Sequence, residues 1–97
     1  MLRISIIEGE SKRRLVLEGK LVAPWIDEVR SAYENAKAVN GRELIVDLRN
    51  LTIISTEGEG LLLELMKHGV RFQSSGVFAK EILRQLARRL SQNGMSK

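Results

Sequence analysis

The chain has 97 residues, of which 43% are hydrophobic and 29% are charged. A chain of this length buries one core, and this composition excludes a disordered protein, which combines low hydrophobicity with high net charge. Cysteine is absent, so disulfides, thiolate metal sites and cysteine nucleophiles are excluded as well. We therefore expect one small folded domain.

The formal net charge is +4, and the excess is concentrated near the C-terminus. Residues 71–97 contain six Lys or Arg and one acidic residue. A basic surface attracts nucleic acids or anionic lipids, but the chain has only one Trp, one Tyr and two Phe to stack on bases. We predict no nucleic-acid binding.

The first residues, MLRISIIEGESKRR, contain a short apolar stretch that ends in charged residues. This stretch is shorter than a signal-peptide core and far below the roughly 20 residues that cross a bilayer. We predict a cytoplasmic protein without a targeting or anchoring segment.

Two short aliphatic stretches predict a β-hairpin near the N-terminus. They are LRISII (2–7) and RRLVLEG (13–19), and the EGESK between them contains the turn formers Gly9 and Ser11. The basic run Lys12–Arg14 is interpreted as a solvated turn.

The stretch APWIDEVRSAYENAK (23–37) predicts the first helix, with Pro24 at its first position and Asp27 in its first turn. Trp25 has two interpretations. It is either an exposed anchor for a partner or a half-buried ring that closes the helix onto the sheet. Asn40-Gly41 predicts the stop of this helix.

The rest of the chain alternates between strand and helix patterns. Residues 44–48 are an apolar run broken only by Asp47, which suits a strand covered by helices on both faces. A Leu-rich helix follows and ends at Gly69, then a short strand over residues 70–75 and a third helix stopped by Asn93-Gly94.

The predicted order of elements is β-β-α-β-α-β-α. Alternation of strands and helices implies crossover connections and a largely parallel sheet. We predict a single α/β domain over residues 1–92, with a small mixed, mostly parallel sheet of four strands and three helices. Residues 93–97 are predicted to be a flexible tail.

Catalytic residues are scarce in the sequence. The one histidine, His68, precedes the helix-ending Gly69, where it would face the negative end of the helix dipole. Without Cys or a second His it cannot assemble a triad or a typical metal site. The EGEG stretch at residues 57–60 lacks the Lys-Ser/Thr pair of a phosphate-binding P-loop. We predict a protein that is not an enzyme and uses no cofactor or metal.

The stretch ISTEGEG (54–60) follows a predicted central strand and opens a helix. In open α/β sheets, binding sites form at this edge. Thr56 followed by Glu59 matches a capping box, in which the Thr hydroxyl accepts from the Glu59 N–H and the Glu59 carboxylate accepts from the Thr56 N–H. Local helix capping therefore accounts for much of this stretch.

The segment LIVDLRNLTIISTEGEGLLLELMKHGVRFQSSGV resembles the centre of a STAS domain, the family of bacterial anti-sigma factor antagonists and related transporter tails. The matching features are a strand ending in Asp47-Leu48, a loop with the apolar residues Leu51 and Ile54, the motif glycine Gly58, and Gly69 before the next strand. The similarity spans most of residues 13–86 with several elements in register, so the resemblance implies a STAS-like fold.

The resemblance implies a protein-binding edge at Ser55, Thr56, Glu57, Gly58 and Glu59. In the antagonist branch of the family, the serine before the motif glycine is phosphorylated by a partner kinase, and Glu57 stands at that position here. Glu cannot accept phosphate, so the resemblance implies that the usual kinase switch is lost or altered. Thr56 and Ser55 remain possible phosphate acceptors beside it.

The sequence leaves three functions open. The first is a non-enzymatic regulator that binds a partner such as an anti-sigma kinase. The second is an accessory subunit of a membrane transport complex for lipids or of the ABC type, with peripheral membrane association through that complex. The third is a sensor of a small ligand or nucleotide at the same strand edge. The oligomeric state is also left open.

Overall fold

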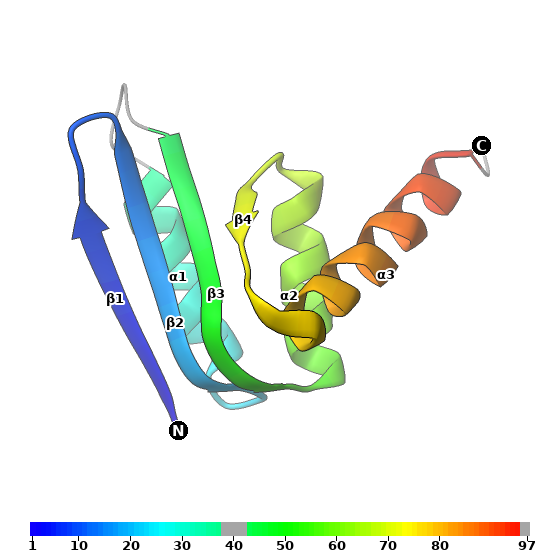
Figure 1. The fold of residues 1–97 in the computed structure, drawn as a ribbon, viewed down its shortest axis with the longest axis horizontal. Coiled ribbons are helices and arrows are strands. Elements are labelled where there is room, and N and C mark those ends of the chain that lie inside the picture. The colour runs from blue at the N-terminus through cyan, green and yellow to red at the C-terminus, as the bar shows by residue number, and fades with distance from the viewer. Residues whose placement is uncertain (38–42, 96–97) are drawn as a thin grey trace.

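The computed structural model describes residues 1–37 and 43–95. Figure 1 shows the elements in the predicted order. They are β1 (Leu2–Glu8), β2 (Lys12–Leu21), α1 (Ile26–Lys37), β3 (Glu43–Ile54), α2 (Thr56–Lys67), β4 (Arg71–Gln73) and α3 (Gly76–Met95).

The four strands form one sheet in the order β1-β2-β3-β4, which is also their order in the chain. β1 pairs antiparallel with β2, whereas β2 with β3 and β3 with β4 pair parallel. Each parallel pair is joined through a helix, as parallel pairing requires. The predicted fold class, a mixed and mostly parallel four-stranded sheet with three helices, is confirmed.

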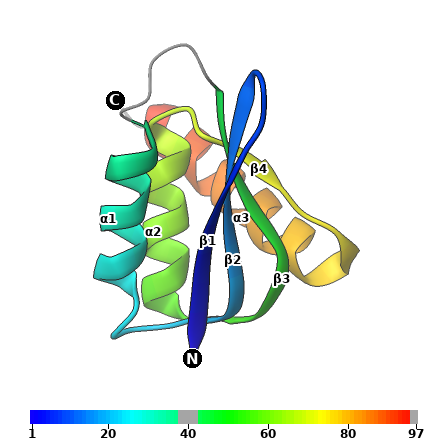
Figure 2. The ribbon, with the colours of Figure 1, turned by 90° about the vertical axis from the view of Figure 1, so that its left-hand side faces the viewer.

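Helices α1 and α2 lie side by side on one face of the sheet, and α3 flanks the β4 end (Figures 1 and 2). Alternate strand residues such as Leu15, Leu17 and Val46 are fully buried and belong to one core with Leu61 and Leu65 of α2. Burial of these aliphatic side chains between sheet and helices supplies the main stabilisation of the fold.

The opposite face of β1, β2 and β3 is not covered by any described helix (Figure 1). The expectation that the strand at residues 44–48 is covered by helices on both faces is therefore wrong. Asp47 explains why the prediction failed. Side chains alternate across a strand, and a carboxylate in the middle of the run belongs on the face away from the aliphatic core. We call this surface the open face.

β3 is longer than predicted and continues to Ile54. The STAS resemblance implied a loop after Leu48. In the structure β2 continues alongside to Leu21, which is the register partner of Ile54, and two register shifts interrupt this pairing. The apolar residues assigned to a loop, Leu51 and Ile54, are strand residues.

The start of the first helix and the basic run before residue 15 also differ from prediction. Pro24 lies in a turn, and α1 begins two residues later at Ile26. The Val29 N–H donates to the Trp25 carbonyl oxygen at the start of this helix. Trp25 is half-buried against the core, which confirms its packing role. Lys12–Arg14 is the first part of β2 rather than a turn.

Helix ends agree with the sequence at one position and differ at another. Gly69 adopts φ of 79° directly after α2, a left-handed conformation that favours glycine and stops the helix as predicted. The stop expected at Asn93-Gly94 is wrong, because α3 continues through them to Met95. Asn40-Gly41 and the last two residues of the predicted tail lie outside the described residues.

Candidate functional site

The predicted binding stretch lies where the sheet meets α2. β3 ends at Ile54, and β2 ends beside it because Leu21 is the partner of Ile54. The Ser55 N–H donates to the Leu21 carbonyl oxygen with an N to O distance of 3.0 Å. This bond ties the start of α2 to the end of β2 and places residues 55–59 at the carboxyl edge of the two central strands.

Ser55, not Thr56, caps α2. Its backbone is extended, and its Oγ accepts a hydrogen bond from the Gly58 N–H at 3.1 Å. The predicted capping box of Thr56 and Glu59 is wrong because the helix starts one residue earlier, so Thr56 is already its first residue. The Glu59 carboxylate instead lies 3.9 Å from the guanidinium of Arg89 on α3.

Gly58 is buried against the ends of both central strands. A Cβ atom at this position would lie 2.5 Å from the Leu21 carbonyl oxygen and 3.1 Å from Cγ2 of Ile54. A larger residue would therefore push the first turn of α2 away from the sheet. At Gly60, two residues on, a Cβ atom would meet nothing within 4 Å, so only the first glycine of the EGEG stretch is required by packing.

The side chains of this edge differ in accessibility. Thr56 and Glu57 are exposed, whereas Ser55 and Glu59 are half-buried. Because the backbone N–H groups of a helix's first turn point outward with partial positive charge, a carboxylate at Glu57 is favoured there. Thr56 and Glu57 are thus the two of the five predicted residues that a partner reaches most readily.

A shallow hollow of about 220 Å³ adjoins Glu57. It is lined by the apolar residues Ala23, Pro24 and Ile26 and by two carboxylates, Asp27 and Glu57. Residues 23–27 were not among the predicted site residues. The predicted parallel pairing of the two central strands contained the signal, because both strand-to-helix connections then emerge at one edge of the sheet.

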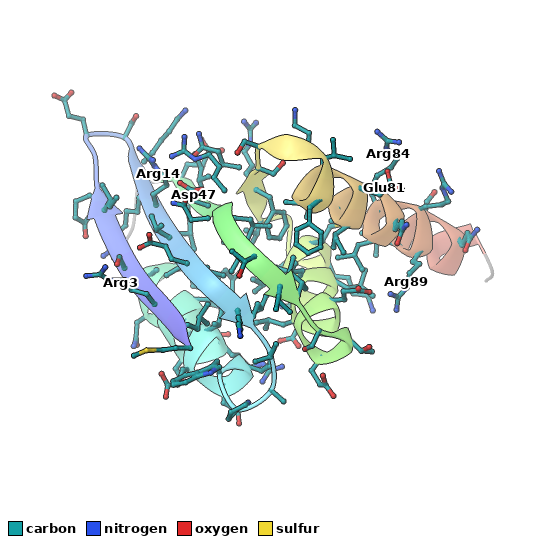
Figure 3. The ribbon with its side chains drawn as sticks, turned by 60° about the horizontal axis from the view of Figure 1, so that its bottom comes forward. Arg3, Arg14, Asp47, Glu81, Arg84 and Arg89 are labelled. Atoms are coloured by element: carbon teal, nitrogen blue, oxygen red, sulfur yellow. The ribbon has the colours of Figure 1, made fainter. Side chains whose placement is uncertain are left out.

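A second arrangement of charged side chains lies on the open face and was missed from the sequence. Asp47 is buried, with 1% of its surface exposed, and it is the one buried polar or charged side chain among the described residues. Arg49 binds it through four hydrogen bonds of 2.8–3.2 Å, from the backbone N–H and Nε to Oδ1 and from Nε and Nη2 to Oδ2. A guanidinium nitrogen of Arg14 lies 3.5 Å from Oδ2 (Figure 3).

The protonation of Asp47 follows from these contacts. Burial alone would raise the pKa of its carboxyl group, but the hydrogen bonds from Arg49, with a further contribution from Arg14, outweigh burial and hold this pKa below its ordinary value. Asp47 is therefore ionised near neutral pH. The sequence feature that indicates this network is the place of Asp47 in the middle of an aliphatic strand, where a buried carboxylate requires a partner.

His68 lies at the C-terminal cap of α2, as predicted. Its Nδ1 is 2.8 Å from the Glu64 carbonyl oxygen, so Nδ1 carries the proton and donates it to that carbonyl. The ring also meets Tyr33 edge-to-face, with centroids 6.5 Å apart. Within residues 1–37 and 43–95, no group of three or more His, Asp or Glu side chains is arranged to hold a metal ion.

Comparison of the chain with protein-family models and with curated proteins found no match. No helix in the described part of the chain is long and apolar enough to span a bilayer.

Proposed function

We propose that this protein is a non-enzymatic protein-interaction regulator of the cytoplasm that resembles a STAS-type anti-sigma factor antagonist. It binds its partner through the exposed start of α2. The observation that carries the proposal is the position of Glu57, which is exposed on the first turn of α2 and lines a partly apolar hollow.

The shape and charge of this edge support a protein partner. A hollow lined by three apolar residues and two carboxylates suits a protruding aliphatic or aromatic side chain flanked by Lys or Arg on the partner. Ser55 and Gly58 hold the turn in place through the cap and the close contact with Leu21. A preformed turn loses little conformational entropy on binding.

The fixed carboxylate at Glu57 gives the surface a permanent charge. A phosphoserine carries about 1.5 to 2 negative charges near neutral pH, whereas Glu carries one. Under this proposal the protein is biased toward the charged state of the family switch, and no kinase is needed at position 57. Should phosphorylation occur beside it, Thr56 is the acceptor, because its side chain is exposed while the Ser55 hydroxyl is engaged in the cap.

The test is quantitative affinity capture from lysate of the producing cells with wild-type protein, Glu57→Ser, Glu57→Ala and Glu57→Lys. We expect a partner whose recovery falls with Glu57→Lys, and partial recovery with the two smaller residues. Glu10→Lys is the matched control, because Glu10 is an exposed acid in the β1–β2 turn on the other end of the sheet. Equal recovery of every protein by wild type and Glu57→Lys would contradict the proposal.

An accessory subunit of a transport complex and a small-ligand sensor stay predictions of the sequence. The same capture experiment separates the first of these, because a membrane transport protein among the Glu57-dependent partners would identify it. A nucleotide panel followed by thermal unfolding addresses the second, since ligand binding to the native state raises its stability.

A further inference from the structure

The open face carries a row of four side chains that crosses the whole sheet. Register pairs Ile7 with Arg14, Arg14 with Ile45, and Ile45 with Arg71. Paired residues of neighbouring strands share a face, so isoleucine and arginine alternate across β1, β2, β3 and β4. We call these four residues the Ile-Arg row.

Two hollows lie along this row. The larger, of about 340 Å³, is lined by Lys12, Arg14, Ile45, Arg71, Phe72 and Gln73. The smaller, of about 150 Å³, is lined by Ile7, Glu8, Gly9, Lys12, Arg14 and Ile45. The hollows share Arg14, Lys12 and Ile45, so they form one shallow surface with apolar patches between cations.

The next row toward the carboxyl edge explains how Arg14 is oriented. Val16 pairs with Asp47, so the buried carboxylate lies one row away from Arg14 on the same face. The contact of 3.5 Å to Asp47 holds the Arg14 guanidinium over the sheet, while 38% of the side chain stays exposed. Arg49 already satisfies most of the Asp47 acceptors, so Arg14 retains N–H donors for a further anion.

Arg71 provides the second cation and is more accessible. Its side chain is 74% exposed, and its Nε contacts the Glu43 carboxylate at 2.8 Å. Two strand spacings separate Arg14 from Arg71, which corresponds to about 10 Å. The aliphatic side chain of Ile45 lies between them, and Ile7, 48% exposed, continues the row on the outer strand.

We propose that the Ile-Arg row is a second docking surface, which binds an acidic peptide segment of a protein partner with aliphatic side chains between its carboxylates. Carboxylates of the segment bind Arg14 and Arg71, and its aliphatic side chains cover Ile7 and Ile45. This surface is separate from the carboxyl edge at Glu57, so the proposal does not depend on the proposed function of that edge.

The layout of the row favours a peptide over other anions. In the row itself cations alternate with aliphatic side chains, so a segment that carries both carboxylates and aliphatic side chains matches it along its length, whereas a phosphate group would leave Ile7 and Ile45 uncovered. Phe72 is the one aromatic residue that lines the two hollows, so a nucleic-acid strand would find a single ring here rather than the series of rings on which successive bases stack. The row is three strand spacings long, at about 4.8 Å each. An extended peptide rises about 3.3 Å per residue, so a segment of about five residues spans the row.

The test starts with a displayed library of random peptides, which is selected for binding to immobilised wild-type protein. The peptides are about ten residues long, twice the length that spans the row. We expect enrichment of peptides that combine Asp or Glu with Leu, Ile or Val. A synthetic copy of the leading peptide is then titrated by fluorescence anisotropy in about 0.05 M and about 0.5 M salt, where screening should weaken binding. Failure to enrich any peptide, or enrichment of peptides without acidic residues, would overturn the proposal.

Variants connect the binding to the row. Arg71→Gln should weaken the peptide about fivefold, as an exposed ion pair would, and Arg71→Gln with Lys12→Gln should weaken it further. Arg84→Gln is the matched control, because Arg84 is an exposed arginine of α3 that pairs with Glu81 at 3.2 Å much as Arg71 pairs with Glu43 (Figure 3). Unchanged affinity in Arg71→Gln, or an equal loss in Arg84→Gln, would refute the assignment.

Two further measurements separate this surface from its alternatives. Glu57→Lys should bind the peptide as wild type does, so a failure of the Glu57 proposal leaves this one standing and the reverse also holds. A double-stranded DNA oligonucleotide or inorganic pyrophosphate that displaces the peptide at equal concentration would show a general anion surface and overturn the peptide assignment.

Discussion

The carboxyl edge and the open face position charged groups in opposite ways. At the carboxyl edge, a capped helix turn seated on Gly58 presents an exposed carboxylate, Glu57, to solvent. On the open face, a buried carboxylate, Asp47, orients the half-exposed guanidinium groups of Arg14 and Arg49. The first surface therefore depends on backbone geometry, and the second depends on a side-chain network. Substitutions should separate the two.

Gly58→Ala should give the largest loss of stability. The added Cβ would lie 2.5 Å from a backbone carbonyl oxygen, and that oxygen cannot move without the end of β2. We expect a loss of about 3 kcal/mol in the free energy of unfolding, typical of overpacking, measured by urea denaturation. Gly60→Ala is the control and should stabilise by about 0.5 to 1 kcal/mol, because its site is open and alanine favours helix. Equal effects at both positions would contradict the close packing of Gly58.

Asp47→Asn should give the next largest loss of stability and should change the open face alone. The amide cannot accept from the Arg49 guanidinium as two carboxylate oxygens do, and its NH₂ would oppose that donor. We expect a loss of roughly 2 kcal/mol and a more mobile Arg14, visible as altered side-chain NMR signals. A stability equal to wild type would mean that this network contributes nothing.

The pH dependence of stability tests the same network without a structural change. The pKa of Asp47 is lower in the folded than in the unfolded chain, so its contribution is complete above the unfolded pKa, near 3.9, and is lost as pH falls through the folded value. The unfolding free energy of wild type should fall below about pH 4. Asp47→Asn should show a smaller slope there, and parallel curves for the two proteins would contradict the pKa direction.

Ser55→Ala should cost about 1 kcal/mol, the usual effect of removing an N-cap side chain. The reason is the hydrogen bond that the Ser55 hydroxyl accepts from the Gly58 N–H. Thr56→Ala should change the unfolding free energy by less than about 0.5 kcal/mol, as exposed substitutions do. If Thr56→Ala were the more damaging of the two in thermal unfolding, the cap would lie at Thr56.

Glu57→Gln should have only a small effect on stability. Its side chain is exposed, and only its favourable interaction with the helix N-terminus is lost, about 0.5 kcal/mol. Partner binding at the carboxyl edge should nevertheless weaken. A loss of stability comparable with that of Gly58→Ala would show that Glu57 is part of the packing rather than of a binding surface.

The sequence predicted the element types and their order because each carries a clear local signal. The spacing of hydrophobic residues and the glycines at turns and helix ends identify the hairpin, the Leu-rich α2 and its end at Gly69. Boundaries failed where tertiary pairing overrides local signals. The STAS resemblance implied a loop after Leu48, but Leu51 and Ile54 lie in β3, because β2 remains alongside to supply hydrogen-bond partners.

The candidate sites were predictable to different degrees. The carboxyl edge at residues 55–59 follows from strand and helix order alone, but the capping residue differs because the chain enters the helix one residue earlier than Thr56. The Ile-Arg row depends on register across four strands. No local pattern determines that register, since the register shifts between β2 and β3 and the placement of β4 are set by packing.

The identity of strand order and chain order has a consequence for folding on the ribosome. Each ladder of the sheet joins strands that follow one another in the chain, so an emerging N-terminal segment meets its own pairing partners before later segments exist. The β1–β2 pairing closes only a short turn, which favours fast assembly, whereas β3 pairs with β2 across the connection that contains α1. We expect the β1–β2 hairpin to acquire protected amides while α3 is still inside the ribosome.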